Sequence, residues 1–160
     1  MNAIEMLVAQ HRRMETMLKD LLDAEPAARR SMFARAADEL MSHVLVEEEV
    51  FYPAVKAERT EDILLESLEE HLSLKRVLSD LVDLPIDDAH FEPKLHVLEE
   101  QTRHHHKEEE EHLFPKVKKL LTGERLETLG AEMAKKQHAI LRESPRHDVT
   151  NQTDAAADLR

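Results

Sequence analysis

Two segments of this chain repeat one pattern of histidine, glutamate and proline. The string His-x-x-x-Glu-Glu-x-x-apolar-aromatic-Pro begins at His43 and again at His105. A histidine and a glutamate four residues apart lie on one face of a helix, so each copy presents a nitrogen ligand beside an oxygen ligand. Imidazole and carboxylate together suit iron, manganese or zinc better than calcium or magnesium. The repeat therefore predicts two ligand faces that hold a pair of transition metal ions between them.

A lone histidine precedes each copy of this pattern, His11 before the first and His71 before the second. Apolar residues recur around these positions at helical spacing, so the polar side chains fall inside apolar stripes. Burying a carboxylate in such a stripe is costly unless it is paired or coordinates a metal. The predicted metal ligands are His11, His43, Glu47, His71, His105 and Glu109.

The elements that position these residues are all predicted to be helical. We expect long helices over about residues 3–24, 28–59, 61–82 and 91–121, and a shorter one over 124–143. Two similar helix hairpins related by approximate two-fold symmetry would form an antiparallel, up-and-down four-helix bundle. The predicted organisation is an all-α bundle over 1–121, a C-terminal helix within 122–143 and a flexible polar tail over 144–160.

Composition narrows the class of protein. The chain of 160 residues has two glycines and no cysteine, which favours helix and excludes disulfides and thiolate ligands. A net charge of −12 disfavours binding to nucleic acid or anionic membranes. The first residues lack a basic segment followed by an apolar one, and no apolar run approaches the roughly 20 residues that span a bilayer. We therefore expect a soluble cytoplasmic protein.

The two motifs and their preceding histidines resemble the hemerythrin-like family, whose HHE cation-binding domains are four-helix bundles around a non-haem di-iron centre. The resemblance covers about residues 3–121 and carries over the same six ligands. The segment after Gly123 is similar to the C-terminal extension of bacterial, notably mycobacterial, hemerythrin-like proteins. The resemblance implies two iron ions with an oxo or hydroxo bridge as the cofactor, with manganese or zinc as alternatives.

The chain departs from the oxygen-carrying members of that family. They have a second histidine one turn after the third-helix histidine, where this chain has Lys75, and their last motif is HxxxxD rather than HxxxE. The set here is nearly symmetric and has one nitrogen fewer, which leaves both metals accessible to O2, hydrogen peroxide or NO. The favoured function is decomposition of hydrogen peroxide in oxidative-stress defence, with no catalytic residue beyond the metal centre. The alternatives are an iron or oxygen sensor that acts through a protein partner, and reversible O2 binding; the oligomeric state stays open.

Several polar residues beside the ligands have two interpretations. Of His105 and His106 only one is expected to face the core, and the latter shares a stripe with the solvent-facing Glu99 and Arg103. His112 is expected to be a partly exposed histidine at the end of the bundle, with a proton relay as the alternative.

The residues that follow the ligand glutamates, and two others near them, also have two interpretations. Glu48 and Glu110 are expected at the surface or beside the ligands, with service as an extra ligand as the alternative. Lys75 either bonds a nearby carboxylate or bound anion, or extends into solvent. Tyr52 is expected to pack on the side of its helix opposite His43, rather than to take part in radical chemistry.

Overall fold

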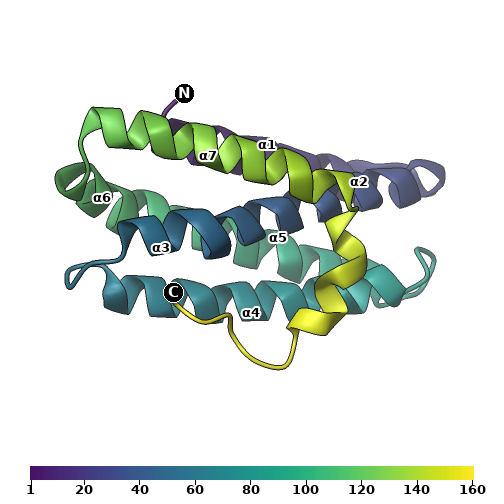
Figure 1. Cartoon of the computed structure of the whole chain (residues 1–160). Helices are drawn as coiled ribbons and strands as arrows, with labels where there is room; N and C mark the ends of the chain where they lie inside the picture. Colours follow the sequence, from purple (N-terminus) through teal and green to yellow (C-terminus); the bar gives the residue numbers. More distant parts are fainter.

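The computed structural model describes all residues from 1 to 160, and every regular element in it is helical (Figure 1). The α-helices are α1 (Ala3–Asp23), α2 (Pro26–Val46), α3 (Tyr52–Val55), α4 (Glu61–Asp83), α5 (Phe91–Glu108), α6 (Phe114–Leu120) and α7 (Gly123–Arg142). Two π-helical turns, η1 (Glu47–Phe51) and η2 (Glu109–Leu113), and a 3-10 helix, η3 (Pro145–Gln152), complete the fold. The all-α prediction is confirmed.

The long helices pack as a four-membered ring. α1 contacts α2 and α5, and α4 contacts the same two helices from the other side. α3 continues the direction of α2, and α6 continues that of α5 (Figure 1). One π turn separates the two helices of each pair. None of the helices combines the length and the apolar composition that crossing a bilayer requires.

Each π turn ends two residues before a proline. Pro53 and Pro115 are the second residues of α3 and α6, and proline has no N–H to donate to the carbonyl four residues back. The preceding residue instead bonds five residues back, from the Tyr52 N–H to the Glu47 carbonyl and in the same way in the second repeat. Each wide turn begins at a predicted ligand glutamate. Such π turns occur often at functional sites.

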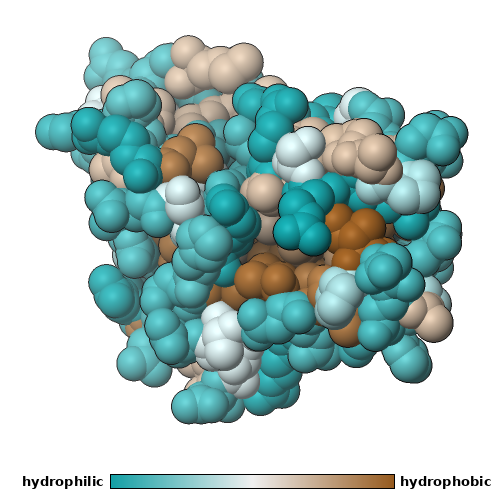
Figure 2. All heavy atoms as spheres, turned by 90° about the vertical axis from the view of Figure 1, so that its right-hand side faces the viewer, coloured by the Kyte–Doolittle hydropathy of each residue, from teal (hydrophilic) through white to brown (hydrophobic).

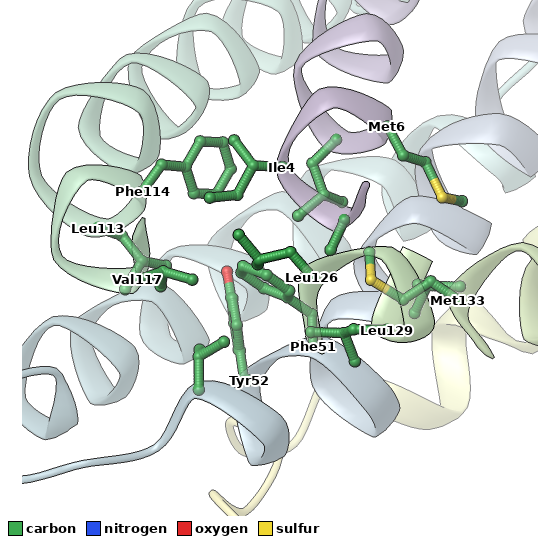
Figure 3. Close-up of a cluster of buried hydrophobic side chains, with 14 of the residues drawn as sticks. Ile4, Met6, Phe51, Tyr52, Leu113, Phe114, Val117, Leu126, Leu129 and Met133 are labelled. Carbon is green, nitrogen blue, oxygen red and sulfur yellow. The ribbon is translucent and has the colours of Figure 1, made fainter. Parts of the chain in front are cut away.

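A polar layer divides the core into two apolar clusters. One cluster gathers residues from the ends of α1, α6 and α7, with Phe51 and Tyr52 among them (Figure 3). The other gathers Met14, Leu18 and residues of α2, α4 and α5 towards the opposite end. Figure 2 looks onto that opposite end and shows a mainly hydrophilic face with a group of hydrophobic side chains near its centre.

The helix after Gly123 covers the groove between α1 and α2. The predicted range of 124–143 agrees closely with the observed α7. This helix approaches the N-terminal segment so closely that a Cβ atom at Gly130 would lie 2.6 Å from the backbone oxygen of Met1. Glycine at this position therefore allows α7 to lie directly against the start of α1.

The first part of the segment predicted as a polar tail over 144–160 packs against the bundle. η3 contacts α2 and α4, and Val149 is fully buried against the second apolar cluster. The Arg146 backbone N–H and guanidinium both donate to the Asp38 carboxylate, at 3.0 and 2.6 Å. The buried Val149 and the bonds of Arg146 together hold this segment against the bundle. Isolated contacts of this kind do not repeat along the sequence, so periodicity does not predict them.

Candidate metal centre

The six predicted ligands meet in the polar layer at the middle of the bundle. Each is at most 2% exposed. His11 comes from α1 and His71 from α4, while the other four come from α2, α5 and the first residues of the two π turns. Three groups of side chains bring their nitrogen and oxygen atoms within 4.8 Å of one another. Two of them share Glu47; they are His11, His43, Glu47 and Glu109, and Glu47, His71 and His105. The third adds a histidine outside the predicted set, and consists of His11, His43 and His106.

The two carboxylates lie between the histidines. Glu47 Oε1 is 3.2 Å from the Nε2 atoms of both His43 and His71. Glu109 Oε1 is 3.2 Å from His11 Nε2 and 3.5 Å from His105 Nε2. Each glutamate therefore approaches one histidine from each hairpin, which is the placement of a carboxylate that bridges two cations.

Several atoms at the centre have no hydrogen-bond partner although they are fully buried. They are the Nε2 atoms of His11 and His43, both carboxylate oxygens of Glu47, and Glu109 Oε1. Buried polar atoms are nearly always satisfied, so a concentration of unpaired acceptors calls for an explanation. Neutral imidazole and carboxylate are ligands of divalent transition metals, and cations among these atoms would satisfy all of them. The donor set therefore fits metal binding.

The lone histidine of each hairpin is held from outside by a glutamate of the other hairpin. His11 Nδ1 lies 2.8 Å from Glu110 Oε2, and His71 Nδ1 lies 2.9 Å from Glu48 Oε2. The second glutamate also accepts from Lys75 Nζ at 2.9 Å, and both members of that ion pair are buried. A carboxylate at Nδ1 fixes the ring orientation and directs Nε2 inward. Of the alternatives for Lys75 the structure shows the bond to a carboxylate, and it leaves the lysine outside the ligand set.

The other two histidines are held by the residues that precede the lone histidines. His43 Nδ1 lies 2.8 Å from Gln10 Oε1, and His105 Nδ1 lies 2.9 Å from Glu70 Oε1. All four rings thus turn Nδ1 outward to an oxygen and Nε2 inward. The two-fold repeat seen in the sequence extends to these outer partners.

Burial sets the protonation of the central groups. Burial, with the neighbouring His43, lowers the pKa of His11 well below its usual value, so this ring is neutral and its Nε2 lone pair is free. Burial and the nearby charge of Glu47 raise the pKa of Glu109 well above its usual range. Burial alone would also raise the pKa of Glu47, but the neighbouring imidazoles, that of His43 foremost, hold it well below its usual value.

The predicted solvent position of His106 is wrong. The residue is buried, and its ring lies parallel to that of His11, with centroids 3.8 Å apart and an interplanar angle of 8°. α5 packs between α1 and α4, so it buries two faces, one carrying His105 towards Glu70 and the next carrying His106 towards Glu15. Single-stripe periodicity identifies only one of them.

Tyr52 also lies closer to the centre than predicted. Its hydroxyl donates to Glu109 Oε2 at 2.8 Å and lies 3.3 Å from His71 Nε2. Burial and the charges of Glu109 and Glu47 raise the pKa of Tyr52 well above its usual range, so the phenol stays protonated. The π turn adds a residue between His43 and Tyr52, and straight-helix geometry therefore places this side chain wrongly. His112, by contrast, is 57% exposed, as expected for an outer histidine.

Comparison with known proteins agrees with this site. The family model of the hemerythrin HHE cation binding domain matches residues 2–117. The fold is similar to the crystal structure of a hemerythrin HHE cation binding domain-containing protein from Mycobacterium kansasii, with a TM-score of 0.79 and 25% identity over 98% of this chain and 97% of that one. A search of curated proteins gave no match.

Proposed function

Because the chain belongs to the hemerythrin HHE cation-binding domain family, we propose that it holds two iron ions and decomposes hydrogen peroxide. The observation that carries the proposal is the set of buried, unpaired nitrogen and oxygen atoms shared by two adjacent groups of side chains. His11 and His43 would hold one ion, and His71 and His105 the other. The carboxylates of Glu47 and Glu109 would lie between them; manganese and zinc suit the same donors. These four histidines and two glutamates are the proposed ligand set.

Bound iron supplies a Lewis acid and a one-electron redox couple. The reaction proposed converts two molecules of hydrogen peroxide into two of water and one of O2, and needs no other reactant. Around the ions the chain's own groups keep fixed roles. The Tyr52 hydroxyl stays protonated and holds Glu109 through its hydrogen bond, while the outer carboxylates keep each imidazole turned inward.

Two features favour turnover of a small oxidant over reversible O2 carriage. Six ligands shared by two ions would leave coordination positions free on both, and Lys75, which bonds Glu48, would not fill one of them. A surface pocket of about 330 Å³ reaches Ser67 and Glu70, and the latter is the hydrogen-bond partner of His105. This groove, which α4 forms with the end of α5, η2 and α6, is the approach that we propose for a molecule as small as peroxide.

A second candidate function, an iron or oxygen sensor, has its own supporting observation. Gln10, which holds His43, also donates to Gln137 Oε1 of α7 at 2.8 Å. Gln137 in turn donates to Ser42 Oγ at 3.2 Å. A change at His43 on metal binding would thus reach the helix that covers the bundle, where a protein partner could read it.

The first test is metal content per chain, followed by peroxide consumption. Protein purified from iron-replete cells should contain close to two irons per chain and consume many peroxide molecules per chain. Glu47→Ala should lose both properties, whereas Glu111→Ala, on the exposed side of the same motif in the second repeat, should keep both. Two irons without turnover would refute the peroxide reaction. Reversible spectral changes with O2 would then indicate storage, and a change in α7 hydrogen exchange on iron removal would indicate sensing.

A further inference from the structure

The two halves of the proposed metal centre are not equivalent. Aligning the repeats places His106 opposite Val44 and Phe114 opposite Tyr52. The His11 ring stacks on two rings, with centroid distances of 3.8 Å to His106 and 5.8 Å to Phe114. Its counterpart His71 stacks on Tyr52 at 5.4 Å. One half therefore contains a fifth buried imidazole that the repeat does not predict.

A nitrogen of His106 lies within 4.8 Å of nitrogens of His11 and His43, but the stacking of its ring argues against direct ligation. The lone pair of an imidazole nitrogen lies in the plane of its ring, so a ligated ion lies in that plane too. The rings of His106 and His11 are parallel within 8° and stacked, so a single ion cannot lie in both planes. Nδ1 of His106 lies 3.4 Å from Glu15 Oε1, a long contact that still turns this nitrogen outward.

We propose that His106 is a positioning residue that holds the His11 imidazole in the plane from which Nε2 reaches Glu109. The flat face of His106 lies against the His11 ring and restricts its rotation, and Phe114 stacks on the same ring at a longer distance. The ion held by His11 and His43 then depends on His106, and the ion held by His71 and His105 does not. This inference rests on the proposed metal centre.

The test compares three replacements at this position. His106→Phe keeps a flat aromatic face without a nitrogen, His106→Leu keeps apolar bulk without a flat face, and His106→Ala removes both. His104→Ala is the matched control, because His104 belongs to the same run of histidines and is exposed. Each protein is loaded anaerobically with ferrous iron, and release to a chromophoric ferrous chelator is followed over time. Circular dichroism and the melting temperature of the metal-free proteins monitor folding.

The wild type should release two irons per chain, and His104→Ala should behave in the same way. In His106→Ala and His106→Leu one of the two irons should be bound about tenfold more weakly, the effect expected when a group that orients a ligand is lost. His106→Phe should retain both irons nearly as the wild type does. A general structural effect would instead lower the metal-free melting temperature and weaken both irons equally.

Three results would overturn this inference. If His106→Ala released both irons at the rate of the wild type, the stacked ring would have no role. Release from His106→Phe as fast as from His106→Ala would show that the nitrogen is required, and that His106 acts as a ligand. Equal weakening of both irons would assign His106 a structural role alone. Wild-type protein that fails to bind two irons would refute the proposed function itself, and the positioning role with it.

Discussion

Replacing Lys75 with methionine tests the buried ion pair behind His71. The Lys75 ammonium and the Glu48 carboxylate are 2.9 Å apart, and their side chains are 3% and 5% exposed. At that separation and an effective dielectric constant of about 20, the attraction is about 6 kcal/mol before desolvation is subtracted. Methionine keeps the length and apolar stem of lysine, so the change isolates the charge.

The expected cost of Lys75→Met is a free energy of unfolding lower by about 3 kcal/mol, because the buried Glu48 carboxylate loses its cation. For a chain of this size, that loss lowers the melting temperature by about 10 °C. Urea unfolding of the metal-free protein at neutral pH measures the change directly. The double variant Lys75→Met, Glu48→Gln should recover part of the loss, since no uncompensated charge is then buried.

Lys94→Met is the matched control. Its ammonium lies 3.1 Å from the Asp80 carboxylate, but the two side chains are 38% and 60% exposed. Exposed pairs of this kind contribute about 0–1 kcal/mol. A loss below about 1 kcal/mol for Lys75→Met as well would show that water reaches the inner pair, and the reasoning from burial would then fail.

Three further predictions concern the centre and the packing around it. Glu47→Ala should abolish binding of a metal pair, which elemental analysis measures as metal per chain. Gly130→Ala should lower the free energy of unfolding by about 1–3 kcal/mol, because the added Cβ would lie 2.6 Å from a backbone oxygen. A Cβ at Gly123 would have no atom within 4 Å, so Gly123→Ala should leave the melting temperature unchanged or raise it. Burial opposes ionisation of Glu70, but the hydrogen bond and charge of His105 outweigh it and lower the pKa of Glu70. This carboxylate therefore stabilises the metal-free fold above the usual glutamate pKa and loses that effect as the pH falls, so Glu70→Gln should reduce the drop in melting temperature between about pH 6 and pH 3.

The sequence predicts much of the fold because its main signals are periodic. The apolar stripes indicate every long helix, and the expected end of the last one lies within one residue of Arg142. The helix expected to reach residue 59 ends at Val55, because the backbone of Lys56 is extended. The repeat also identifies the six residues that meet in the core, while their binding of metal stays a prediction.

The sequence predicts less about what surrounds those six residues. A single apolar stripe per helix places His106 in solvent, whereas α5 packs against two neighbours. Straight-helix geometry places Tyr52 on the far side of its helix, because it does not contain a π turn. The η3 segment is held by Arg146 and Val149, two isolated contacts with no repeating pattern. Such details depend on tertiary packing, which periodicity does not encode.

The outer partners of the lone histidines cross between the two halves of the bundle. His11 of the first hairpin is held by Glu110 of the second, and His71 of the second is held by Glu48 of the first. Neither hairpin supplies the Nδ1 partner of its own lone histidine. Either hairpin produced alone would therefore lack an orienting carboxylate, and mixing the two separately produced hairpins should be needed to complete the polar layer.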